Sequence, residues 1–294
     1  MANANADWRS TDLGPARTLE LDGARVRAHV TGEGPAIVFV HGALVNANLW
    51  RKVVPRLDGF TRVTLDLPLG SHLIPVPARP NTPPDIAKLI GEAVTALDLH
   101  DVTLVGNDTG GAICQLAAAE RPDWLGRLVL TSCDAFEHFP PPRLKPLFAL
   151  LRLPGGLRAG YALMRFRAPR HLPIAFGWLV HERIPDDATD SYVLPVIQNA
   201  GVRDDATRLA RGVDPADTLA AAEKLRSFDR PALIAWSADD RFFPPSDGER
   251  LAATIPGARL EWIAGARTFS AEDRPERLAE LIASFAREPV GGAA

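Results

Sequence analysis

The sequence predicts an α/β protein built on a doubly wound, mostly parallel sheet with a helical cap. Short apolar runs that are typical of buried strands alternate with helical segments over most of the chain, and such alternation favours a doubly wound sheet. The alternation stops after Asp134 and returns at Pro231. We therefore expect a helical insert over the carboxyl edge of the sheet, where ligands bind in such folds.

The composition suits one large domain. The chain has 294 residues, of which 46% are hydrophobic, enough for one buried core. The net charge is −3 with charges scattered along the chain, so we expect no nucleic-acid partner and no membrane partner. The first ten residues are polar and predict no secretory signal. Because two cysteines, Cys114 and Cys133, do not make a disulfide framework, we expect a cytoplasmic protein.

The elements of the first half follow in a regular order. Residues 19–21 and 25–30 read as strands around an Asp22-Gly23 hairpin turn. Residues 36–40 are all apolar, which is typical of a strand buried on both faces. The remaining predicted elements are helix 48–57, strand 62–65, helix 84–97, strand 102–105, helix 110–120 and strand 127–131.

The second half divides into an insert and a return to the sheet. The insert is proline-rich near its start and then helical, with no strong strand. The predicted elements after it are strand 232–236, helix 246–253, strand 259–263 and helix 275–285. We therefore predict a core of residues 1–135 and 227–294 and a helical cap of residues 136–226.

A sharp strand-to-helix turn is predicted at residues 105–111, Val-Gly-Asn-Asp-Thr-Gly-Gly. Side chains at Gly106 and Gly110 would collide with neighbouring backbone in such a turn. Asp108 is then forced out at the N-terminus of the next helix, where the helix dipole favours a carboxylate. The simpler alternative is that Asp108 only caps that helix.

This segment resembles the G-x-S-x-G nucleophile elbow, with Asp in place of Ser. With His41-Gly42 at the right distance before it, the chain resembles the α/β-hydrolase superfamily over nearly its whole length. Within it the chain resembles the haloalkane dehalogenases and epoxide hydrolases, whose nucleophile is an aspartate. In that branch the carboxylate attacks carbon to form an ester, and a His-activated water hydrolyses the ester.

The resemblance also implies a pocket for an oxyanion or leaving group. It would be built by His41, Gly42 and Ala43, with the amides of Ala43 and Thr109 as donors. The chain lacks both the Asn that binds halide in dehalogenases and the Pro of the same loop in epoxide hydrolases. Thr109 stands where dehalogenases usually have a halide-binding Trp, so dehalogenation is the weaker of the two expectations.

The acid of the site is expected after strand 232–236. The segment that ends in Pro244 resembles the family pattern G-x-x-D-x-x-x-P, which makes Asp240 the acid and Asp239 the alternate; a solvated acidic turn is the simpler reading. Some dehalogenases take their acid from the strand before the cap, and Asp134 and Glu137 are the candidates there.

The catalytic histidine of the family is missing. Its position in the closing pattern G-x-x-H is occupied by Thr268, and no His occurs after His181. Ester formation needs no base, but ester hydrolysis does, and a hydroxyl cannot serve as that base near pH 7. Either another residue replaces the His, with His72 and His138 as leading candidates, or the reaction is not a two-step hydrolysis. Packing is the ordinary alternative for each of these histidines.

The cap contains Tyr161 and Tyr192. Epoxide hydrolases use cap tyrosines to protonate the opening ring, although packing is the commoner role of a tyrosine on a helix. We expect an enzyme that needs no cofactor and no metal, acts on a small apolar molecule, and is a monomer or homodimer. Hydrolysis through an Asp108 ester is the first hypothesis. The alternatives are a lyase, isomerase or cyclase that uses Asp108, and an inactive small-molecule-binding protein.

Overall fold

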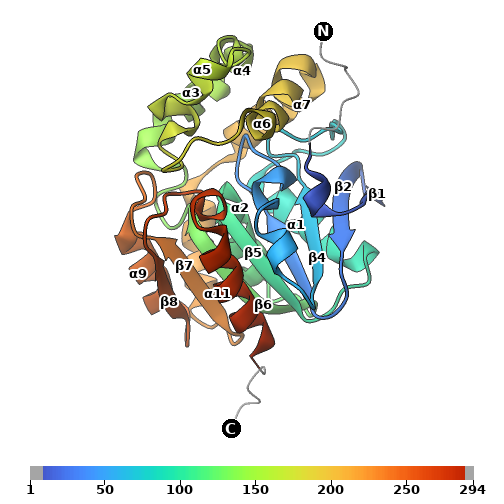
Figure 1. The fold of residues 1–294 in the computed structure, drawn as a ribbon, viewed down its shortest axis with the longest axis vertical. Helices are drawn as coiled ribbons and strands as arrows, with labels where there is room; N and C mark the ends of the chain where they lie inside the picture. Colours follow the sequence, from blue (N-terminus) through green and yellow to red (C-terminus); the bar gives the residue numbers. More distant parts are fainter. Residues whose placement is uncertain (1–8, 289–294) are drawn as a thin grey trace.

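The computed structural model describes residues 9–288 (Figure 1). Most of the N-terminal segment that predicts no secretory signal lies outside the described residues. No helix within residues 9–288 is long and apolar enough to cross a membrane.

An eight-stranded sheet forms the centre of the molecule, in the order β1-β2-β4-β3-β5-β6-β7-β8. The strands β1, β2 and β4 pair antiparallel, and all later neighbours are parallel. The predicted mostly parallel sheet is therefore confirmed. The strands are β1 (Ala16–Leu21), β2 (Ala24–Thr31), β3 (Ala36–Val40), β4 (Thr61–Asp66), β5 (Val102–Asp108), β6 (Leu125–Cys133), β7 (Ala232–Ser237) and β8 (Arg259–Ile263).

Two hydrophobic cores lie on the two faces of this sheet. In β3, Ile37 and Phe39 belong to one core, whereas Val38 and Val40 belong to the other, because successive strand side chains point to opposite faces. One core receives α11 (Pro275–Arg287). The other receives the helices α1 (Pro83–Ala96), α2 (Thr109–Ala119), α8 (Pro215–Leu225) and α9 (Pro245–Thr254).

The predicted helix 48–57 is wrong. The structure has two short 3-10 turns there, η2 (Ala47–Trp50) and η3 (Val54–Arg56). Asn46 caps the first turn by accepting from the Asn48 amide at 3.0 Å. Pro55 has no amide hydrogen to donate to the preceding turn, and its ring disfavours a continuous α-helix. The spacing of apolar residues that predicted a helix here instead reflects the burial of two separate turns.

The chain between β6 and β7 contains no strand within the described residues. Its helices α3 to α7 gather at one end of the sheet, at the top of Figure 1, while α8 packs against α2. The elements are η4 (Pro142–Leu144), α3 (Lys145–Leu151), α4 (Gly156–Tyr161), α5 (Arg167–Arg170), η5 (Pro173–Gly177), α6 (Asp186–Gln198) and α7 (Ala200–Gly212). This arrangement covers the edge of the sheet at which Asp108 ends β5.

Candidate active site

Asp108 stands at a strained turn between β5 and α2. Its backbone has φ 56° and ψ −134°, in a region that residues other than glycine rarely adopt, and such strain gathers at functional sites. The carboxylate Oδ1 accepts a hydrogen bond from the Thr109 amide at 2.5 Å and from the Thr109 hydroxyl at 3.2 Å. Asp108 therefore caps α2 through Oδ1.

Glycines make room for this turn. A Cβ on Gly110 would lie 2.3 Å from the carbonyl oxygen of His41, and a Cβ on Gly106 would lie 2.7 Å from the sulfur of Cys114. A Cβ on Gly42 would lie 2.6 Å from the Cβ of Asp108. These approaches are shorter than atoms in a close-packed core tolerate. The loop after β3 therefore lies directly against the Asp108 side chain.

Asp108 opens into an apolar pocket of about 250 Å³. Ala43 and Thr109 lie beside it at the sheet end, and α3, α4 and η5 supply most of the opposite wall. Phe242 and Phe269, from the loops after β7 and β8, close another side. Apolar walls around one polar group are typical of small-molecule sites.

The Asp108 carboxyl is held close to half-ionised at neutral pH. Burial raises its pKa to about 7, and the negative charge of Asp240 acts in the same direction, against the lowering effect of the two Thr109 hydrogen bonds. No histidine charge contributes. A group with this pKa can act either as a nucleophile or in proton transfer near pH 7.

One oxygen of the Asp240 carboxylate lacks a hydrogen-bond partner among the described residues. Asp240 Oδ1 accepts from the amides of Phe242 and Phe243 at 2.8 and 2.9 Å and from the hydroxyl of Thr268 at 3.0 Å. Oδ2 is buried without a hydrogen-bond partner among the described residues, although the Ser132 hydroxyl lies nearby. Burial raises the pKa of Asp240. The Thr268 hydroxyl satisfies one oxygen but leaves the second unpaired.

Asn107 ties the elbow to the loop that carries Thr268. Its amide nitrogen donates to the Thr268 carbonyl at 2.8 Å and to the Thr131 hydroxyl at 2.9 Å. Asn107 was not predicted as a site residue, although it stands beside Asp108 in the elbow. Sequence position gave no sign of its partner, since the two residues are 161 positions apart.

His41 supports its loop but does not line the pocket. Its Nε2 accepts from the Leu67 amide at 3.1 Å, so the hydrogen sits on Nδ1, which lies 2.9 Å from the Gly42 carbonyl. Burial lowers the pKa of His41 to about 4, so the ring is neutral. Its contribution is to fix the path of Gly42 and Ala43 beside Asp108.

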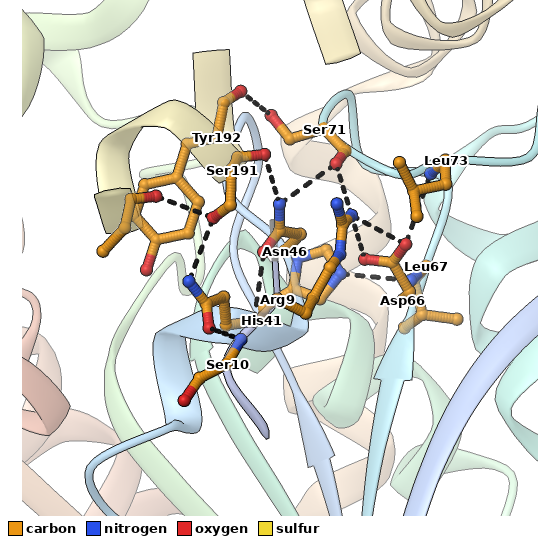
Figure 2. Close-up of polar contacts among 12 residues, drawn as sticks. Arg9, Ser10, His41, Asn46, Asp66, Leu67, Ser71, Leu73, Ser191 and Tyr192 are labelled. Carbon is orange, nitrogen blue, oxygen red and sulfur yellow. Dashed lines mark hydrogen bonds and ion pairs between the residues drawn. The ribbon is translucent and has the colours of Figure 1, made fainter. Parts of the chain in front are cut away.

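A buried polar network fastens the same loop to the cap (Figure 2). Asn46 donates to the carbonyls of Ser191 in α6 and of Ser71, at 2.7 and 3.1 Å. Arg9 donates to Asp66 at 2.8 Å and to the Ser71 carbonyl at 2.9 Å. Because removing one partner from a buried network is costly, the loop is held rigidly on the side away from the pocket.

The structure does not bring His72 or His138 to the pocket. His72 Nε2 lies 2.8 Å from Asp205 of α7, and His138 Nδ1 lies 2.7 Å from Asp247 of α9. Neither side chain lines the cavity that Asp108 enters, and no histidine within residues 9–288 does. Each imidazole already has a carboxylate partner on a helix outside the pocket wall.

The other acids differ in burial. Asp134 is 1% exposed, and burial together with the charge of Asp108 raises its pKa. Glu137 is exposed and pairs with Arg250 at 2.8 Å, while Asp239 lies 3.0 Å from His181. Asp134 is therefore a second buried carboxyl close to Asp108.

The two tyrosines have different environments. Tyr161 lines the pocket, and burial raises its pKa, which keeps its hydroxyl protonated. Tyr192 packs against Phe176 with ring centroids 5.7 Å apart but is not a pocket residue. Within the described residues no group of three or more His, Cys, Asp or Glu side chains is arranged to hold a metal ion.

Comparison with known proteins places this geometry in a family. The model of the alpha/beta hydrolase fold family matches residues 35–275. The chain belongs to the α/β-hydrolase fold family. The strand-to-helix turn that holds Asp108 lies within the matched residues.

Relatives of this α/β-hydrolase include dehalogenases. It is 31% identical over 288 residues to "Haloalkane dehalogenase 2" of Mycobacterium tuberculosis, covering 92% of this chain and 95% of the relative. It is 27% identical to "Uncharacterized hydrolase YugF" of Bacillus subtilis, over 93% and 98% of the two chains. The structure of the haloalkane dehalogenase DatA from Agrobacterium tumefaciens has the same fold, with a TM-score of 0.78 at 23% identity over 94% and 98%. The α/β-hydrolase is accordingly an enzyme of a hydrolase family.

Proposed function

We propose that the protein acts on a small apolar electrophile and that Asp108 forms an ester with it. The observation that carries the proposal is a carboxylate on a nucleophile elbow, facing an apolar pocket. The elbow fixes the angle of attack, and the Thr109 amide holds one oxygen while the other is available to attack carbon. Hydrolysis of the ester would then complete a turnover.

Ester hydrolysis is the slow step in this proposal. A water must lose a proton as it attacks the ester, and no imidazole stands between Asp240 and Asp108. Oδ2 of Asp240 has no hydrogen-bond partner among the described residues, and it is the oxygen to which an imidazole would bind. Thr268 cannot remove the proton, because its hydroxyl is far too weak a base.

An epoxide is the favoured class of electrophile. Opening of an epoxide by Asp108 breaks a carbon–oxygen bond, and the released oxygen needs a proton. Tyr161 lines the pocket and stays protonated, so its hydroxyl can supply that proton. A halide needs no proton and leaves as an anion. The dehalogenase relatives make an alkyl halide the second electrophile to test.

Proton transfer by Asp108 without an ester is the second candidate function. The raised pKa of about 7 favours it, because an acid or base works best with a pKa near the working pH. A lyase, isomerase or cyclase of this kind would not need the missing histidine.

Intact-mass spectrometry separates these functions. The protein is incubated with styrene oxide or 1-bromobutane, and the adduct is mapped to a residue. We expect a persistent adduct that maps to Asp108 and that is absent from Asp108→Ala. Turnover with no adduct would mean that a base is present after all. Neither adduct nor turnover with either probe would contradict ester formation and favour the second function.

A further inference from the structure

One stretch of the cap carries a charge opposite to that of the rest of the chain. Residues 138–181 contain no Asp or Glu and seven Lys and Arg, which leaves 26 Lys and Arg against 36 Asp and Glu elsewhere. The near-neutral total therefore conceals a strongly basic segment on an acidic protein. Arg167 and Arg170 form ion pairs with Asp190, and the other five cations create a local field that attracts anions.

The same segment exposes apolar side chains. Five of the seven exposed large hydrophobic residues among residues 9–288 lie in it. They are Leu153, Leu163, Phe166, Leu172 and Ile174, each more than half exposed. Single exposed apolar residues need no explanation, but a group of them rimmed by charge marks an interaction site. We call this group, with Arg158 and Arg165, the cap patch.

The cap patch lies at the far end of the molecule from the sheet. Its residues lie in α4, in η5 and in the turns that flank α4 and α5, and Figure 1 shows α4 and α5 at the extreme top. The Arg165 guanidinium lies 4.6 Å from the ring centroid of Phe166. A cation and an apolar ring that share one exposed spot are typical of surfaces that meet the boundary between lipid headgroups and acyl chains.

A second pocket, of about 270 Å³, opens beside the patch. Three guanidinium groups line it, from Arg158, Arg165 and Arg203, and its lining contains no carboxylate. Arg203 is fixed by donating to the carbonyls of Val196 and Ile197 at 2.8 and 2.9 Å. Guanidinium groups are the donors that bind phosphate oxygens best, so this pocket fits a phosphate headgroup.

We propose that the cap patch docks on the surface of a bilayer that contains anionic phospholipid. Its cations meet the negative headgroups, its apolar side chains enter the interface, and the arginine pocket takes one phosphate. The proposal replaces our expectation of no membrane partner, which was based on the net charge. A second copy of the chain fits less well, because two such basic faces repel each other.

Docking would also bring the active-site pocket to the lipid. Ile174 is 74% exposed and lines the pocket that contains Asp108. An apolar molecule dissolved in the bilayer would therefore reach Asp108 without crossing open water. This orientation follows from the patch and the pocket sharing α4 and η5.

Vesicle co-sedimentation tests the docking. The full chain is mixed with phosphatidylcholine vesicles with and without phosphatidylglycerol. We expect binding only with phosphatidylglycerol, weakened by salt because salt screens the attraction. The double variant Arg158→Glu with Arg165→Glu should lower binding at least about tenfold. Leu163→Ser with Leu172→Ser should lower it as well, and keeps the test valid if the arginine variant fails to fold.

Matched controls separate the patch from net charge. Arg25→Glu with Arg226→Glu changes the charge equally, at side chains 59% and 62% exposed that do not belong to the cap patch. Leu219→Ser removes an exposed apolar residue from α8. Both should leave binding unchanged. Equal loss in the controls, equal binding to neutral vesicles, or a dimer that the arginine variant dissociates would each overturn the proposal.

Discussion

The elbow after β5 and the loops after β7 and β8 are the two halves of the proposed site, and they differ in completeness. At the elbow, each feature supports Asp108: close glycines, the Thr109 amide and a rigid loop from β3. In the other half, Oδ1 of Asp240 accepts from two amides and from the Thr268 hydroxyl, whereas Oδ2 has no hydrogen-bond partner among residues 9–288. The surroundings that Asp108 would need to form an ester are in place. Asp240, which would orient a base that activates water, has no such base beside it in the described part of the chain.

Apart from changes to Asp108 itself, we expect a substitution at Gly42 to have the largest effect on adduct formation. In Gly42→Ala the new Cβ would lie 2.6 Å from the Cβ of Asp108 and would push the carboxylate out of line. A displacement of about 1 Å can reduce rates by about 10²-fold, and we expect that loss in adduct formation. Gly91→Ala is the control, because its Cβ meets nothing closer than 3.4 Å. An unchanged rate in Gly42→Ala would mean that the elbow is less rigid than its contacts indicate.

Restoring the histidine tests the incomplete half. In Thr268→His the imidazole would stand beside Asp240, but a water site must exist as well. We therefore expect breakdown of the Asp108 ester to accelerate by less than about 10²-fold, the lower end of the range for general base catalysis. The adduct is followed by mass spectrometry after excess reagent is removed. A larger acceleration would show that only the base was missing.

The pH dependence of adduct formation tests the ionisation of Asp108. Because the pKa of Asp108 is raised to about 7, the fraction of Asp108 in the reactive carboxylate form increases as pH rises through 7. Adduct formation should rise about tenfold between pH 6 and pH 8. Since the folded state keeps a proton that the unfolded state loses near pH 4, the contribution of Asp108 to stability falls between pH 4 and 7. A flat rate profile would contradict the raised pKa.

The smallest effect is expected at Asp240. In Asp240→Asn the remaining carbonyl oxygen can still accept the loop hydrogen bonds, so adduct formation should change by less than about threefold at pH 8. Loss of its charge should lower the pKa of Asp108, because that charge now raises it, and should move the rate profile to lower pH. A large loss of adduct formation would show that the two halves act as one unit.

Net charge and charge distribution led to opposite expectations for the surface. The total of −3 predicted no membrane partner, whereas the cap patch gathers cations and apolar side chains at one end of the molecule. The acid-free stretch is visible in the sequence, but its meaning depends on exposure. Arg170 in the same stretch is buried and pairs with Asp190, so it contributes nothing to that surface.

The sequence by itself determined the succession of strands along the chain and the sharp turn at Asp108, and it places Thr268 where the resemblance implies a histidine. These features depend on neighbouring residues: apolar periodicity, glycine at a tight turn, and the identity of one position. The tertiary structure alone decided that His72 pairs with Asp205 and His138 with Asp247, over 100 positions apart. It also decided that Tyr161 and not Tyr192 lines the pocket. Such contacts depend on how helices pack across the sheet, which local patterns do not encode.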